Sequence, residues 1–103
     1  MKYKIMFADE AIRDLDRVWD EIFSVTKDIT VTSNYVNSLI DTIENKSYYP
    51  YSGTQLYYDD AFTGYYFVRF KAYLSFYRLT EFVMFVDRIL YAKSDYIKCF
   101  KDV

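Results

Sequence analysis

Three runs rich in aromatic and β-branched residues follow one another in the C-terminal half with almost no gap between them. They are YYFVRFK at 65–71, YLSFYRLT at 73–80 and FVMFVDRILYA at 82–92. Residues of these types favour strands, and the breaks near 71–72 and 80–81 are short enough for tight hairpins. The pattern therefore predicts a three-stranded antiparallel meander, which must bury at least one face against another layer.

The N-terminal half supplies a further strand and two helices. KYKIMF at 2–7 alternates apolar and charged side chains, which predicts a strand. From Asp9, apolar residues recur every three to four positions, which predicts an amphipathic helix with Asp9 as its N-cap. The Thr- and Asp-rich piece at 26–33 breaks this period, which restarts at Tyr35, so we expect a helical hairpin.

These elements give the order β-α-α-β-β-β, an α+β fold in which a two-helix hairpin packs on a small antiparallel sheet with the first strand at an edge. A chain of 103 residues suits one core, so we predict a single domain over 1–103. Segment 45–64 shows no sustained period, and we expect it to be the longest irregular connection. The expected helix-to-sheet core residues are Trp19, Phe23, Tyr35 and Leu39.

The residue types present exclude several classes of site. The sequence has no histidine and a single cysteine, Cys99, so it offers neither an intrachain disulfide nor a usual ligand set for a transition metal. We expect no metal and no cofactor. No apolar run approaches the roughly 20 residues of a membrane span, and the N-terminus lacks the apolar core of a signal peptide. The expectation is a cytoplasmic protein without membrane contact.

The net charge of −2 hides an asymmetry between the two halves of the chain. Residues 1–60 carry 6 Lys and Arg against 11 Asp and Glu, whereas residues 61–103 carry 7 against 4. The basic half could meet phosphates or an acidic partner, but the acidic whole weakens long-range attraction to nucleic acid. We expect the acidic residues of the first helix to form a solvated face: Asp9, Asp14, Asp16, Asp20 and Glu21.

In the order and spacing of its motifs, the chain resembles the RelE/ParE superfamily, the toxins of bacterial type II toxin-antitoxin modules. The likeness rests on the helix FADEAIRDLDRVWDEI after a first strand, a Pro-x-x-Gly turn from Pro50 to Gly53, the strands YYFVRF and SFYRL, and the terminal RILYAKSDY. It implies a small toxin, of the kind found in plasmid-stabilising modules, that a cognate antitoxin neutralises. An exposed end strand of the meander would be the docking edge, lined by Tyr65, Phe67 and Tyr73.

The resemblance implies two possible activities and a set of site residues. Relatives of RelE and YoeB cleave mRNA on the ribosome, whereas relatives of ParE poison DNA gyrase. Metal-independent RNA cleavage needs a base, an acid and a cation for the phosphate. By resemblance, Arg69 is the phosphate-binding arginine and Tyr96 lies near the C-terminal tyrosine of family nucleases. Arg88, on a neighbouring predicted strand, could add to the same cationic patch and is a third catalytic candidate. The candidate binding residues are Arg78, Tyr91, Lys93 and Asp95.

The nuclease set looks incomplete. Tyr91 stands where many relatives have histidine, and a phenol with a pKa of about 10 transfers protons poorly at neutral pH. Ribosome-targeting relatives are strongly basic, whereas this chain is acidic. Without the resemblance, its strand arginines are equally expected to pair with Asp87 or a helix carboxylate. We favour a ParE-like, gyrase-directed toxin; the alternatives are a ribosome-dependent mRNA endonuclease and a degenerate relative that binds antitoxin without toxicity.

Overall fold

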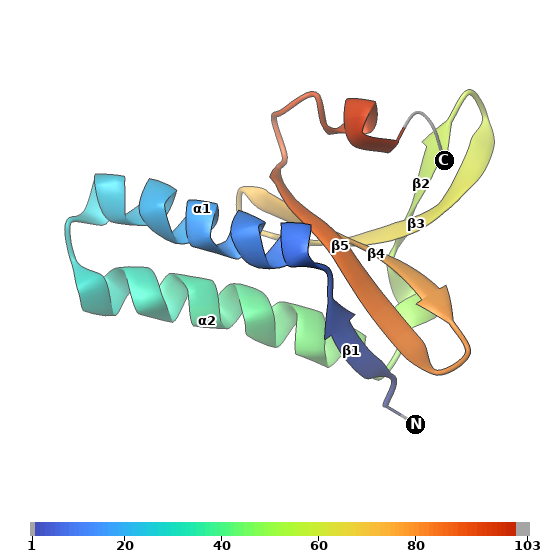
Figure 1. Ribbon diagram of the computed structural model, residues 1–103, viewed down its shortest axis with the longest axis horizontal. Helices are drawn as coiled ribbons and strands as arrows, with labels where there is room; N and C mark the ends of the chain where they lie inside the picture. Colours follow the sequence, from blue (N-terminus) through green and yellow to red (C-terminus); the bar gives the residue numbers. More distant parts are fainter. Residues whose placement is uncertain (1, 101–103) are drawn as a thin grey trace.

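The computed structural model describes residues 2–100 (Figure 1). Its elements are β1 (Lys4–Phe7), α1 (Asp9–Thr26), α2 (Ile29–Lys46), η1 (Pro50–Ser52), β2 (Thr54–Tyr58), β3 (Ala61–Phe70), β4 (Tyr73–Thr80), β5 (Val83–Tyr91) and η2 (Tyr96–Phe100), where η marks a 3₁₀ helix. Within these residues, no helix combines the length and the apolar composition that crossing a membrane requires.

The strands form one sheet in the order β1-β5-β4-β3-β2, and α1 and α2 lie as a hairpin along it (Figure 1). The predicted α+β fold, its helical hairpin and the edge position of the first strand are confirmed. The prediction of an all-antiparallel sheet is wrong at one point, because β1 pairs with β5 in parallel. A parallel pair needs a long crossover, and the chain between β1 and β5 provides it.

Segment 45–64 is not the irregular connection that we expected. It contains η1 and a fifth strand, β2, which pairs antiparallel with β3. The turn between them places Asp59 and Asp60 at positive φ, 52° and 62°, as in the tight turns that favour hairpins. Because β2 covers β3, the predicted docking edge lined by Tyr65, Phe67 and Tyr73 is not free, and Tyr73 is buried in the core.

Both helices begin elsewhere than predicted. Ala8 occupies the N-cap position of α1, so Asp9 lies in the first turn, where its charge still favours the helix dipole. α2 begins at Ile29 because the Asp28 side chain accepts a hydrogen bond from the Val31 backbone N–H (3.0 Å). The Thr-rich piece that seemed to be a break is therefore the first turn of a capped helix.

Two apolar cores lie on opposite faces of the sheet. The helix-side core contains Leu39, which is fully buried, with Trp19 and Tyr35 partly buried against it, while Phe23 is half-buried and stacks on Trp19. We call the face turned away from α1 and α2 the second face. Its core consists of Leu56, Leu74, Phe76, Leu90 and Phe100.

A bulge in β5 decides which of its side chains point to which face. The pairing of β4 and β5 shifts register between Phe76 and Tyr77, which leaves Asp87 as an extra residue. Val86 and Ile89 both belong to the helix-side core although they are three residues apart, which strict alternation along a strand does not allow. The extra residue shifts the alternation by one position, so that Ile89 points to the helix-side core as Val86 does.

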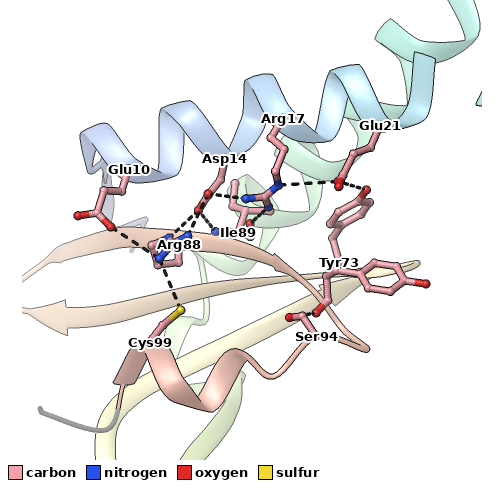
Figure 2. A network of polar contacts seen from close by, with 10 residues as sticks. Glu10, Asp14, Arg17, Glu21, Tyr73, Arg88, Ile89, Ser94 and Cys99 are labelled. Atoms are coloured by element: carbon pink, nitrogen blue, oxygen red, sulfur yellow. Dashed lines mark hydrogen bonds and ion pairs between the residues drawn. The ribbon is translucent and has the colours of Figure 1, made fainter. Parts of the chain in front are cut away.

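Polar side chains of α1 bind the edge of β5 beyond the end of β1 (Figure 2). β1 pairs with β5 only as far as Val86, so the next edge groups of β5 lack a strand partner. The Ile89 N–H donates to Asp14 Oδ2 (2.9 Å), and Arg17 Nη2 donates to the Ile89 carbonyl (2.8 Å). The helix thus satisfies the buried backbone groups that the short strand leaves open.

Asp14 is the centre of this network. It also accepts from Arg88 (2.8 Å from Nε to Oδ2, and 3.2 Å from Nη2 to Oδ1) and from Arg17 (2.9 Å), and only 5% of its surface is exposed. The prediction of a solvated acidic face is therefore wrong at Asp14. Its position explains this, because Ala11, Asp14 and Val18 follow the helical period along the buried side of α1.

We predict that Asp14→Ala lowers the free energy of unfolding by about 3–5 kcal/mol, because it leaves the partly buried Arg88 guanidinium and the buried Ile89 N–H without an acceptor. Asp14→Asn should lose less, since its amide oxygen can still accept from the Ile89 N–H. Asp16→Asn, on the exposed side of α1, is the matched control and should stay within about 0.5 kcal/mol. Urea unfolding monitored by circular dichroism measures these differences. Equal stability of Asp14→Ala and Asp16→Asn would contradict the central role of Asp14.

The turn around η1 is fixed to the sheet by a buried tyrosine. The Tyr77 side chain is fully buried, and its hydroxyl donates to the Pro50 carbonyl (2.5 Å). Burial raises the pKa of this hydroxyl far above its ordinary value. Gly53 permits this approach, because a Cβ there would stand 1.9 Å from the Tyr77 hydroxyl oxygen. Its φ of −66° suits any residue, so space alone demands glycine.

We predict that Gly53→Ala destabilises the chain by about 1–3 kcal/mol, as overpacking of a close contact does. The same change made on a Tyr77→Phe background should cost less, because the clashing oxygen is then absent. A double-mutant cycle from urea unfolding measures the coupling between the two positions. If the two changes simply add, the contact does not explain the glycine.

Candidate functional site

The second face of the sheet carries the arginines that the sequence singled out. Residues directly opposite each other on β3 and β4 share this face, and the pairs are Tyr65 with Arg78, Phe67 with Phe76, and Arg69 with Leu74. On β5, Arg88 lies opposite Phe76. The candidate site is therefore an aromatic surface with an arginine at each of three places.

The three arginines do not form one cationic cluster. Arg69 and Arg78 lie at opposite ends of the face, since Tyr65, the partner of Arg78, is four residues from Arg69 along β3, or roughly 14 Å. Arg88 lies between them on β5, opposite the fully buried Phe76. A single phosphate cannot meet all three at once in this arrangement.

Arg78 is held by a carboxylate of the same sheet. Its Nε donates to Asp87 Oδ2 (2.8 Å), the same oxygen that accepts from the Tyr65 hydroxyl (2.8 Å), and its guanidinium lies over the Phe85 ring (4.6 Å). Burial, followed by the hydrogen bond to Asp87, raises the pKa of Tyr65 to about 12. At neutral pH this phenol is uncharged, and Asp87 balances the charge of Arg78.

Arg88 is held by acidic residues of α1 (Figure 2). Besides Asp14, its guanidinium approaches Glu10 Oε2 (3.7 Å) and Cys99 Sγ (3.6 Å). The hydrogen bond to Asp14 is the main cause of the raised pKa of Arg88. A hollow of about 230 Å³ lies over this group, but Glu10 and Asp87 also line it. An anion that approached Arg88 here would meet two carboxylates as well.

Arg69 differs from the other two arginines. Its side chain is exposed and its Nε donates to the Lys71 carbonyl (2.7 Å). Among residues 2–100 no carboxylate lies within ion-pair distance of it. Arg69 is therefore the strand arginine whose charge remains available to a ligand.

The C-terminal candidates separate into two groups. Tyr96, in η2, packs on Phe76 (5.3 Å between ring centroids) on the second face, and the buried Phe100 packs on the same ring (4.7 Å). Tyr91 instead lies opposite Tyr73, a residue of the helix-side core, and their rings meet edge to face (5.9 Å). The structure thus brings Tyr96 to the second face and turns Tyr91 to the other.

The remaining candidates, Lys93 and Asp95, lie on the exposed turn between β5 and η2. Asp95 forms an ion pair with Lys98 (3.3 Å), three residues further along the chain. Neither of the two candidates contacts a strand arginine through an ion pair within residues 2–100. In the same part of the chain, no group of three or more Cys, Asp or Glu residues is placed to hold a metal ion.

The sequence patterns offered Asp87 or a helix carboxylate as possible partners of the arginines, but they did not single out Asp14 and Glu10 as the neighbours of Arg88. The available signal for Asp87 is a lone acid inside the apolar run FVMFVDRILYA, because a charge within a strand needs a partner or a bulge. Asp14 carried a weaker signal. It lies at the spacing of the buried residues of α1, but the other acidic residues near it in the sequence obscure this pattern.

This fold occurs in solved structures of toxin-antitoxin systems. One solved structure, of the chromosomal ParDE toxin-antitoxin system from P. aeruginosa, has a TM-score of 0.75 at 12% identity and covers 89% of this chain and 98% of that one. Another, of the RelBE2 toxin-antitoxin complex from Mycobacterium tuberculosis, has a TM-score of 0.63 at 19% identity, with coverages of 88% and 99%. At these identities the likeness shows the fold alone.

Sequence comparison decides the family. No curated protein matches the chain. The model of the family described as the ParE toxin of type II toxin-antitoxin systems, parDE, matches residues 5–96, which is most of the sequence. This match confirms the resemblance that the order and spacing of the motifs indicated. The chain belongs to the ParE toxin family of type II toxin-antitoxin systems.

Proposed function

We propose that the chain inhibits bacterial growth from within the cytoplasm by binding DNA gyrase, without cutting RNA. The observation that supports this most directly is the pairing of the strand arginines. Asp87 holds Arg78 and Asp14 holds Arg88, each at 2.8 Å. The second face therefore offers a phosphate one available arginine, Arg69.

Proton transfer is the second argument for a binding mechanism. RNA cleavage without a metal needs a base for the 2′-hydroxyl and an acid for the leaving oxygen. The sequence contains no histidine, and the Tyr65 phenol, with its pKa raised to about 12, neither accepts nor donates a proton readily at neutral pH. A toxin that acts by occupying or trapping its target needs neither group.

We predict that the purified chain inhibits supercoiling of relaxed plasmid by DNA gyrase and causes cleaved plasmid to accumulate, while mRNA on programmed ribosomes stays intact. A heat-unfolded sample of the same chain is the control in both assays. The proposal fails if mRNA is cut and gyrase is unaffected. If Arg69→Ala then abolishes cutting, the endonuclease alternative is the correct one, with Arg69 as its phosphate-binding residue.

The same choice can be tested in cells. We predict that induction without antitoxin lowers thymidine incorporation before methionine incorporation and induces the response to DNA damage. Arg69→Ala should leave this order unchanged, because gyrase binding does not need a phosphate clamp. Early loss of methionine incorporation that Arg69→Ala relieves would identify translation as the target. Normal growth on induction of the folded chain would favour the degenerate, non-toxic alternative.

We further propose a cognate antitoxin as the partner. The two solved structures described above are of a toxin-antitoxin system and a toxin-antitoxin complex. We predict that the product of the adjacent reading frame copurifies with the chain at a defined ratio and restores growth when both are expressed. A chain that stays a stable monomer and ignores that product would contradict this prediction.

A further inference from the structure

A group of exposed tyrosines surrounds η1, away from the second face. We call the exposed Tyr48, Tyr49 and Tyr51, together with the half-buried Tyr3, the tyrosine corner. Tyr48, Tyr49 and Tyr51 are 51%, 76% and 64% exposed, although large aromatic side chains usually gain most by burial. Exposed aromatic residues that gather on one surface are typical of interaction sites, because such side chains dominate binding energy.

The backbone of the tyrosine corner is held in place by contacts that would not be needed for a loose loop. Besides the Tyr77 bond to Pro50, the Tyr3 N–H donates to the Ser47 carbonyl (2.9 Å), which ties β1 to the end of α2. Ser52 Oγ donates to the Tyr49 carbonyl (2.6 Å) and accepts from Lys46 Nζ (3.0 Å). A rigid surface loses less entropy when it binds, so these contacts prepare the corner for a ligand.

The tyrosines line a shallow hollow that is open to solvent. A hollow of about 520 Å³ is lined by Tyr3, Tyr48, Tyr49, Pro50, Tyr51 and Ser52, none of which is charged. The Tyr51 ring meets Tyr3 at 85° and Tyr66 at 90°. The Lys2 ammonium lies over the Tyr48 ring, 5.7 Å from its centroid. Ring edges and one proline thus form an apolar depression that suits an aliphatic or prolyl side chain.

The surroundings of this hollow are basic, in contrast to the chain as a whole. Lys2 and Lys4 line a second hollow together with Tyr3, and Lys46 lines a third together with Tyr49. Glu44 is the one acidic residue that lines any of these three hollows among residues 2–100. With three lysines against one glutamate, this corner attracts an acidic ligand although the chain as a whole has a net charge of −2.

We propose that the tyrosine corner binds an acidic, extended polypeptide segment, with one apolar side chain in the hollow and carboxylates at the flanking lysines. Single-stranded nucleic acid has the same charge, but it binds to exposed ring faces on which successive bases stack. Here Tyr3 and Tyr51 are perpendicular and Lys2 covers one face of Tyr48, so the geometry favours a peptide. This inference does not rest on gyrase binding and stands if the toxin acts elsewhere.

The test begins with a random 12-residue peptide library displayed on phage and selected on the purified full chain. The most enriched peptide is then synthesised with a fluorescent label, and its affinity is measured by fluorescence anisotropy. We expect enriched sequences to combine Asp or Glu with Pro or Leu. Tyr49→Ala should weaken binding at least tenfold, as loss of a central aromatic residue does. The double variant Lys2→Ala/Lys4→Ala should weaken it about fivefold and reduce its dependence on salt.

Matched controls distinguish binding at the corner from nonspecific binding and from loss of the fold. Tyr57→Ala removes another exposed tyrosine, on β2, and Arg13→Ala removes an exposed cation on α1; neither should change the affinity. Unchanged urea unfolding of Tyr49→Ala shows that its fold is intact. The proposal is overturned if enriched peptides are not acidic, if no peptide is enriched, or if Tyr49→Ala binds as the unaltered chain does. If the chain binds labelled dT12 but no peptide, and Tyr49→Ala loses that binding, the corner is a site for nucleic acid.

Discussion

The buried carboxylate of Asp14 joins the two layers of this protein. The parallel strand β1 is only four residues long, and its pairing with β5 ends at Val86. A free strand edge beyond that point would leave buried backbone groups without partners, which costs as much as a lost hydrogen bond for each group. Asp14 and Arg17 take both groups of Ile89, so a helix completes the edge that a longer strand would otherwise cover.

The bulge at Asp87 makes this closure possible and also shapes the candidate site. By adding one residue, it turns Ile89 back to the helix side and presents Asp87 and Arg88 together near the second face. Asp87 then accepts from Tyr65 and Arg78, and Arg88 reaches across to Asp14. The same backbone feature therefore secures the core and neutralises two arginines. Arg78 and Arg88, which were singled out as site residues, therefore both have carboxylate partners within the fold.

Local sequence patterns were sufficient for much of the fold, and long-range pairing explains the rest. The alternation and length of the runs at 73–80 and 82–92 predicted β4 and β5 closely, and the apolar period of the first helix predicted α1. The strand β2 was missed because its turn uses Asp59-Asp60 in place of the glycine that usually marks such turns. The roles of Asp14 and Asp87 depend on partners some 74 and 22 residues away, which no local period reveals.

The second face and the tyrosine corner differ in how much charge and aromatic surface they offer to a partner. On the second face, Phe76 and Leu74 are covered by η2, and most of the positive charge is internally balanced, so little binding energy remains for a polyanion. At the tyrosine corner, large side chains are exposed, their backbone is fixed, and the lysines beside them are largely without acidic neighbours. A surface that is rigid, aromatic and basic loses little entropy and gains much contact area on binding. We therefore expect recognition by this chain to rely on the surface around η1, to which the Tyr77 hydroxyl is bonded, more than on the second face of the sheet.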